Sequence, residues 1–266
     1  MNTVHPLTFM RFQLPMMKYW DYIKYSSKTT LKSRYSNMYL GYVWWFLDPL
    51  LFMIIYSFVY QIVFQRELEN YIIFLLIGLI TWRWISGSLT QSSASIFQRL
   101  GLIEQIAAPK QIFPLVNILI ETMLFIAAFV IIFIAMVFSS VPFTWHIIEV
   151  VPVALVTLVA LYGLGMIFAH VGTYIADFKQ VLSYLLRLTF YLSPIFYDLS
   201  DLSAEVQNIY WLNPVTAIVQ GIRSALIYGT SPDYLSLLYV LLIGLITIPI
   251  GYFLLKKYDS TYAKIK

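Results

Sequence analysis

The segment of residues 40–60, LGYVWWFLDPLLFMIIYSFVY, decides the fold of this chain. It begins with a cluster of Gly, Trp and Pro residues and continues as a run of apolar side chains. A bilayer contains no water to satisfy backbone amide and carbonyl groups, so an apolar segment of about twenty residues is stable there as a helix. The segment therefore predicts a point at which the chain enters a membrane.

The composition of the whole chain agrees with this prediction. Of its 266 residues, 60% are hydrophobic and 11% are charged, which leaves too few polar side chains to cover a soluble globule of this size. The chain is therefore expected to be a polytopic membrane protein. Aromatic residues make up 18%, more than two interfacial belts need, so some are candidates for lining a pathway. Aromatic residues also pack helix against helix, and this alternative stays open.

Several classes of protein are disfavoured by what the sequence lacks. It has no cysteine, which excludes disulfides, thiolate metal sites and cysteine nucleophiles, and its three histidines are far apart. It contains no GxxxxGK[ST] phosphate-binding loop. If the protein uses ATP, another chain must hydrolyse it, and this chain is not expected to be an enzyme.

The hydrophobic pattern predicts an all-α fold with six transmembrane helices in one domain, residues 1–266. The expected spans cover about residues 42–64, 71–85, 115–138 and 147–169, then the run from the turn at 174–180 to about 197, and 235–255. Residues 1–38 form a cytoplasmic segment whose part after Pro15 fits an amphipathic interfacial helix or, alternatively, an ordinary basic flank. Within 198–233, the pieces 206–212 and 215–228 are too short to span and are expected to be re-entrant or interfacial outer helices.

The distribution of basic residues predicts the orientation. Six spans place both termini in the cytoplasm, and the N-terminal segment has no apolar core long enough for a signal peptide. The cytoplasmic segments then hold thirteen basic residues: Arg11, Lys18, Lys24, Lys28, Lys32, Arg34, Arg99, Lys110, Lys179, Lys256, Lys257, Lys264 and Lys266. The outer loops hold Arg66 and Arg223, as the positive-inside rule requires. The net charge of +4 thus reflects topology, and no nucleic-acid partner is expected.

Arg83 and Arg187 fall within or at the ends of predicted spans, and Glu121 falls inside the third. Arg83 lies about 18 Å from the outer end of the second span and Glu121 about 9 Å from the inner end of the third, so the two are at similar depths. A lone charge there costs roughly 3 kcal/mol on insertion scales. We expect an ion pair between them. The alternatives are that Arg83 contacts phosphates of a substrate or extends to the cytoplasmic interface.

Small residues mark two other places in the spans. The second span becomes small and polar at Ser86, Gly87, Ser88 and residues 91–93, which fits either a water-lined helix end or close helix packing. The fourth span contains Gly163 and Gly165, which permit close helix contacts.

An ordered set of short motifs connects these features to a known family. They are Leu40-Gly41 with Trp44 and Pro49, Gly78-Leu79 with Trp82, GLIEQIAAPKQIFPL at 101–115, Asp177, SPIFY at 193–197, and Asn213-Pro214 followed by Arg223. In this order, over nearly the whole chain, they resemble the membrane subunit of type-2 ABC exporters. Within that superfamily the chain most resembles permeases for lipid-linked polysaccharides, namely O-antigen and wall teichoic acid. It departs from the family pattern at Glu104, Ala108 and Ala176.

The resemblance implies partners and a coupling segment. The family works as a homodimer with two copies of a separate ATPase, which binds ATP and Mg, so no cofactor is expected in this chain. The loop at 99–114 resembles a coupling helix that docks on the ATPase, with Arg99, Gly101, Glu104, Pro109 and Lys110 as candidate coupling residues. The simpler interpretation is that its prolines only separate one helix from the next.

The resemblance also implies a substrate and a pathway. The family carries undecaprenyl-diphosphate-linked glycans or polyol-phosphate polymers through a channel between two permeases. Tyr56 and Tyr60 on the first span and Tyr184 and Tyr191 on the fifth are candidates for its lining, unless they pack between helices or anchor at interfaces.

The expected function is therefore a permease subunit in the bacterial cytoplasmic membrane that exports a lipid-linked cell-envelope polysaccharide. One alternative is a type-2 ABC exporter of a drug, a peptide or another lipid. A second is an intramembrane polyprenyl-phosphate transferase, which needs clustered acidic or His residues, whereas the acids here are scattered. An ion-driven transporter usually has internal repeats and several mid-span ionisable residues, and neither pattern is evident.

Overall fold

The computed structural model describes residues 19–35, 41, 43–63, 70–103, 109–139 and 141–262. Every regular element in these residues is a helix, which confirms the all-α class. In chain order they are α2 (Trp20–Tyr35), α3 (Val43–Phe58), η3 (Val59–Val63), α4 (Tyr71–Ser93), η4 (Phe97–Arg99), α5 (Leu100–Ile103), α6 (Ile112–Phe138), η5 (Trp145–Glu149), α7 (Val150–Tyr174), α8 (Phe178–Tyr191), η6 (Leu199–Asp201), α9 (Ala204–Tyr210), α10 (Pro214–Arg223), η7 (Ser224–Tyr228), α11 (Tyr234–Lys257) and α12 (Asp259–Tyr262).

Within the described residues, four helices are long and apolar enough to cross a membrane. They are Tyr71–Ser93, Ile112–Phe138, Trp145–Tyr174 and Tyr234–Lys257, which correspond to the predicted second, third, fourth and sixth spans. The predicted first span is α3 continued by the π-helix η3, and the predicted fifth span is α8, which has 14 residues. The multi-helix membrane architecture is confirmed, and the count of six spans stays a prediction.

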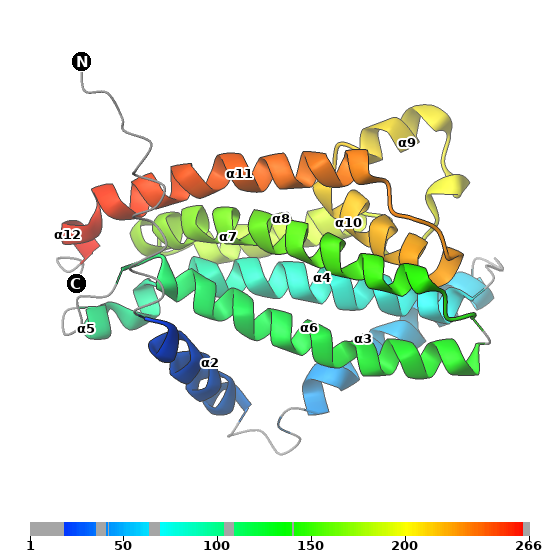
Figure 1. The fold of residues 1–266 in the computed structure, drawn as a ribbon, viewed down its shortest axis with the longest axis horizontal. Helices are drawn as coiled ribbons and strands as arrows, with labels where there is room; N and C mark the ends of the chain where they lie inside the picture. The colour runs from blue at the N-terminus through cyan, green and yellow to red at the C-terminus, as the bar shows by residue number, and fades with distance from the viewer. Residues whose placement is uncertain are drawn as a thin grey trace.

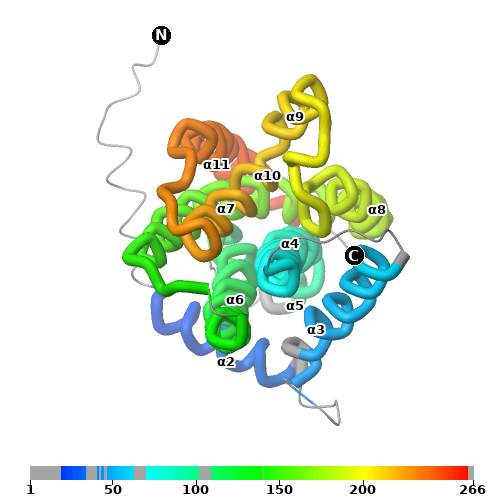
Figure 2. The backbone as a smooth tube through the Cα atoms, turned by 90° about the vertical axis from the view of Figure 1, so that its right-hand side faces the viewer, coloured from blue at the N-terminus to red at the C-terminus, as the bar shows by residue number. Residues whose placement is uncertain are grey.

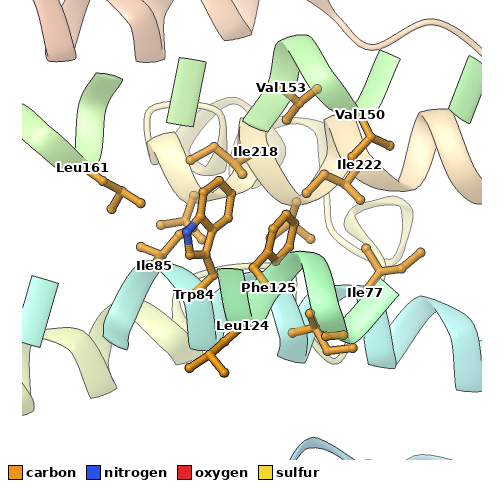
Figure 3. Packing of buried hydrophobic residues seen from close by; sticks show 14 of the residues in the cluster. Ile77, Trp84, Ile85, Leu124, Phe125, Val150, Val153, Leu161, Ile218 and Ile222 are labelled. Atoms are coloured by element: carbon orange, nitrogen blue, oxygen red, sulfur yellow. The ribbon is translucent and has the colours of Figure 1, made fainter. Parts of the chain in front are cut away.

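Helix α4 lies in the middle of the bundle. Viewed along the bundle, α3, α6, α7, α8 and α10 surround it (Figure 2). In the most apolar 18 residues of α4, 72% is buried, against 22% in the corresponding stretch of α11. An apolar side-chain distribution all around a helix is typical of such a central position. In the core shown in Figure 3, Trp84 of α4 stacks on Phe125 of α6 with ring centroids 4.2 Å apart, and its Nε1 donates to Thr122 Oγ1 at 3.0 Å.

Helices α7 and α11 lie side by side along the bundle (Figure 1). A Cβ atom at Gly244 of α11 would lie 2.8 Å from the backbone nitrogen of Ala160, closer than real Cβ contacts. A Cβ atom at Gly163 of α7 would collide with Thr247. Without a hydrophobic driving force between helices in lipid, such small residues allow the close backbone approach that holds them together. The expectation that Gly163 permits close helix contacts is confirmed.

The short helices gather at the two ends of the bundle (Figure 1): α2, α5 and α12 at one end, and α9 and α10 at the other. Helix α2 buries Ile23 and Ser27 and exposes Lys24, Lys28 and Lys32, and its place at a membrane interface stays a prediction. The pieces expected at 206–212 and 215–228 are indeed short helices, namely α9 and α10 with η7. Helix α10 begins where Asn213 Oδ1 accepts a hydrogen bond from the Val215 amide and Pro214 occupies the first turn.

Candidate functional site

A cavity of about 430 Å³ opens between α3, α4 and α8. Each helix contributes one face, with side chains three or four residues apart, as helical geometry requires. The lining consists of Pro49, Phe52 and Tyr56 from α3, then Leu79, Trp82, Arg83, Ser86 and Thr90 from α4, and Ser183, Leu186, Arg187, Phe190 and Tyr191 from α8. We call this cavity the groove. It combines aromatic rings, hydroxyl groups and two guanidinium groups.

Aromatic side chains form a continuous wall on one part of the groove. The aromatic wall comprises Phe52, Tyr56, Trp82, Phe190 and Tyr191. Tyr56 is the central ring, with centroids 6.2 Å from Phe52 and 6.0 Å from Phe190, and Trp82 lies 5.6 Å from Phe190. Phe196 supports the wall from the loop after α8, since it stacks on Tyr56 at 5.3 Å. The wall joins three helices through the ring-to-ring contacts that aromatic side chains favour.

The four tyrosines proposed to line a pathway fall in three different environments. Tyr56 and Tyr191 line the groove. Tyr60 is 6% exposed and stacks on Tyr71 at 4.2 Å, so it packs between helices. Tyr184 is exposed on α8, where the Arg187 guanidinium lies 5.7 Å from its ring centroid. The structure thus brings two of the four together, and substrate contact by any of them stays a prediction.

Arg83 has a different carboxylate partner from the one expected. Its Nη1 donates to Asp48 Oδ2 of α3 at 2.6 Å, across the groove entrance formed by α3 and α4. The expected partner, Glu121, lies on α6 and is 5% exposed. Its carboxylate packs against α4 at Gly87, where an added Cβ atom would lie 2.8 Å from Glu121 Oε2. Glu121 therefore packs on α4 one turn after Arg83, while the carboxylate that Arg83 contacts is that of Asp48.

The small polar end of α4 packs against α6 on one face and lines the groove on another. Ser88, Ser92 and Ser93 are buried, and α6 attaches to this end through Asn117 Nδ2, which donates to the Gln91 carbonyl at 2.8 Å. On another face, Ser86 and Thr90 line the groove. One face therefore packs closely and the other supplies hydroxyl groups to the cavity.

A fully buried arginine of α10 joins the loop after α8 to α4. Arg223 of α10 is 0% exposed. Its Nη1 donates to the Pro194 carbonyl, its Nη2 donates to the Ile195 carbonyl at 2.8 Å and to the Phe74 carbonyl at 3.0 Å, and its Nε donates to Phe74 at 3.3 Å. Its guanidinium also lies over the Phe74 ring, 3.3 Å from the centroid. These bonds hold the SPIFY loop against α4, and with it Phe196, which supports the aromatic wall.

At the opposite end of the bundle, the segment around η4 and α5 is attached to α2 and α12. Arg99 Nη1 donates to the Ser95 carbonyl at 3.2 Å and its Nη2 to Thr30 Oγ1 of α2 at 3.4 Å. The Lys110 side chain is 8% exposed and its Nζ lies 3.2 Å from Asp259 Oδ1 of α12. Both expected coupling cations therefore contact the chain itself.

The other expected coupling residues differ in position. Gly101 of α5 is exposed, and an added Cβ atom there would meet nothing within 4 Å. The Pro109 carbonyl accepts from the Ile112 amide at 3.1 Å and starts α6. Glu104 lies outside the described residues.

Helix α12 is fastened to α7 by an aromatic and histidine cluster. His170 Nδ1 and the Tyr262 hydroxyl are 2.7 Å apart, and Tyr262 is fully buried. Tyr258 and Tyr174 pack on the same imidazole, at 4.9 and 5.0 Å between ring centroids. The cluster places Asp259 beside Lys110. Among the residues that the structure describes, no group of three His, Asp or Glu side chains is arranged to hold a metal ion.

Sequence reasoning did not select several residues of the groove. Asp48, Phe52, Phe190 and Arg187 were not proposed as site residues, and Trp82 was noted as a motif residue alone. The spacing of some of these residues indicated a shared helix face. Phe52 and Tyr56 are four residues apart, and so are Ser183 and Arg187. The sequence could not say which face of each helix is turned to its neighbours.

We predict that replacing Arg223 by methionine strongly destabilises the protein. Methionine fills similar volume but leaves the Pro194 and Ile195 carbonyls without a charged donor, and hydrogen bonds to charged groups contribute about 1.5–3 kcal/mol each. The measurement is the thermal unfolding midpoint and the monodisperse fraction in detergent. Arg223→Lys should lose less, and Lys179→Met, at an exposed position on α8, serves as the control. An Arg223→Met protein with a wild-type midpoint would contradict the prediction.

Known proteins with similar sequences identify the family. The family model described as "ABC-2 type transporter" matches residues 22–227. An O-antigen export system permease protein RfbA of Klebsiella pneumoniae is 28% identical over 248 residues, which cover 92% of this chain and 95% of the relative. A protein of the same name from Myxococcus xanthus is 27% identical over 206 residues, or 76% of this chain and 79% of the relative. The polysialic acid transport protein KpsM of Escherichia coli is 23% identical over 224 residues, or 83% and 87%.

The family match extends from α2 to η7 and so includes the groove, the SPIFY loop and Arg223. Together with the apolar helices, it makes this chain a multi-pass protein of the cytoplasmic membrane. The chain belongs to the ABC-2 type transporter family and is a membrane permease subunit of that family.

Proposed function

We propose that this chain is the permease subunit of an ABC exporter that carries a lipid-linked cell-envelope polysaccharide across the cytoplasmic membrane. The observation that carries the proposal is the groove between α3, α4 and α8, with its aromatic wall and hydroxyl groups. The names of relatives that align over most of this chain, O-antigen export permease and polysialic acid transport protein, support it.

The chemistry of the groove suits a saccharide polymer. Sugars present apolar C–H faces and a rim of hydroxyl groups, so they stack weakly on aromatic rings and form hydrogen bonds at their edges. Phe52 and Tyr191 of the aromatic wall are about half exposed, at 51% and 52%, and are therefore available for contact. Ser86, Thr90 and Ser183 supply hydroxyl groups to the same cavity. Repeated weak contacts of this kind let a polymer slide without binding it tightly.

We predict that removing rings of the aromatic wall slows export. In a bacterium whose own permease gene is deleted but whose ATPase and polymer synthesis are intact, Tyr56→Ala and Tyr191→Ala should each lower the appearance of surface polymer about two- to tenfold. Lipid-linked polymer should accumulate inside, and it is measured together with the surface polymer. Tyr234→Ala, which removes an exposed ring of α11 outside the groove, is the matched control. Wild-type chain that restores no surface polymer would contradict the proposed function.

The proposed topology has six spans and both termini in the cytoplasm. Residues 43–63, α3 with η3, measure about 31 Å, which matches the hydrocarbon core. Helix α8 measures about 21 Å, and the SPIFY loop after it supplies the rest of the fifth crossing. This non-helical loop is compatible with membrane depth because Arg223 satisfies its carbonyls. Helices α9 and α10 then form the re-entrant outer segment.

We predict the labelling pattern that follows from this topology. Because the chain has no cysteine, single cysteines can be introduced at exposed positions without removing a background. Ser203→Cys and Thr230→Cys should react with a membrane-impermeant maleimide in intact cells, whereas Lys28→Cys and Ala176→Cys should react after permeabilisation alone. Labelling at position 28 or 176 in intact cells would overturn the orientation.

The proposed assembly is a homodimer with two ATPase subunits, which bind ATP and Mg, so that this chain needs no cofactor. In this assembly the exposed Gly101 on α5 contacts the ATPase. Arg99 and Lys110 have a second role in this proposal, since their contacts rigidly attach η4 and the start of α6 to α2 and α12. Force passes between subunits only through such a rigid element.

We predict that the Lys110–Asp259 ion pair supports coupling. In the complex with the ATPase, Lys110→Asp or Asp259→Lys alone should lower stimulated ATP hydrolysis about threefold, in the range of a partly exposed ion pair. The double variant should restore most of it, because the pair is re-formed with opposite polarity. Lys257→Asp, an exposed charge at the same end, is the control for net charge. Full coupling in either single variant would contradict the prediction.

A further inference from the structure

The groove contains a guanidinium group whose charge has no carboxylate partner in the part of the chain that the structure describes. Arg187 lies on α8, about 14 Å along the helix from its first residue, Phe178. It is exposed, and its contact within the chain is with the ring of Tyr184, 5.7 Å from the guanidinium carbon. A cation at such a depth in a membrane segment is costly and is a marker of function.

The second arginine of the groove does not compete for the same role. Arg83 is paired with Asp48 at 2.6 Å, so its positive charge is compensated within the chain. Among the residues that the structure describes, the two guanidinium groups of the groove and the Asp48 carboxylate leave a net charge of about +1, and it is located on Arg187. This charge calls for an anion from outside the chain.

The groups around Arg187 indicate which anion fits. Guanidinium groups bind phosphate in a bidentate manner with planar, directed hydrogen bonds. Hydroxyl groups of Ser86, Thr90 and Ser183 line the same cavity and can donate to further phosphate oxygens. A phosphate would thus find both a charge and neutral donors there, while the aromatic wall offers stacking surfaces for sugars beside it.

Apolar side chains next to Arg187 decide between a lipid and a free ion. Phe52, Leu79 and Leu186 line the groove together with it, and Phe52 is 51% exposed. A hydrated inorganic anion gains nothing from such a surface, whereas a hydrocarbon chain attached to a phosphate does. We infer that Arg187 binds the phosphate group of a phosphorylated membrane lipid. Given the proposed function, this is the phosphate group that joins the lipid carrier to its glycan.

The test measures binding to the full-length permease, purified with its ATPase subunit in nanodiscs. The probe is radiolabelled undecaprenyl phosphate, and undecaprenol, the same chain without phosphate, reports the hydrocarbon contribution. Arg187→Gln should raise the Kd for undecaprenyl phosphate about tenfold, or about 1.4 kcal/mol, and Arg187→Lys should recover part of it. Both variants should bind undecaprenol as the wild type does. Lys179→Gln, which removes another exposed charge of α8, should change neither Kd.

The possible outcomes separate the inference from its alternatives. The inference is wrong if wild-type protein does not bind undecaprenyl phosphate, if Arg187→Gln binds it with unchanged Kd, or if the variant loses undecaprenol equally. Competition by inorganic pyrophosphate as strong as that by the lipid would assign the site to a free ion and overturn the lipid assignment. If wild-type chain restores surface polymer while any of these results is found, the inference alone fails. If the wild-type chain restores no surface polymer in the deletion strain, the proposed function itself is wrong.

Discussion

The need to satisfy backbone carbonyls away from water governs this structure, and Arg223 is where it is most evident. The chain leaves helical geometry after α8, at Pro194 and Ile195, and the carbonyls freed there cannot rely on bulk water. A fully buried guanidinium from α10 donates to both and to Phe74 of α4. One side chain thus fixes the loop, α10 and the central helix relative to one another.

The central helix α4 serves three sets of neighbours with three kinds of side chain. Trp84 stacks into α6, and the buried serines near its end allow close contact with α6 and α7. Trp82 and Arg83 point instead into the groove. A helix with apolar residues on nearly every face has no solvent side, so small and polar residues mark its contacts more clearly than hydrophobicity does.

Several charged groups in the membrane region have an identifiable reason to be there. Arg83 and Asp48 neutralise each other between α3 and α4, and Arg223 is solvated by carbonyls. Arg187 remains with an aromatic neighbour, Tyr184, as its contact in the described chain. Since an unbalanced charge in a membrane segment is costly, its position beside the aromatic wall connects the electrostatics of the bundle to its transport role.

The sequence by itself determined the all-α class, the helix positions and the family resemblance, because a bilayer demands long apolar helices and turns are marked by Gly, Pro and charged residues. It also placed Tyr56 and Tyr191 correctly on two helices that form the groove. Tertiary structure decided what depth alone cannot specify, namely the rotation of each helix about its axis. The rotation of α3 and its continuation turned Tyr60 into the core, and the packing of the bundle paired Arg83 with Asp48 and joined Lys110 to Asp259, about 150 residues away in sequence.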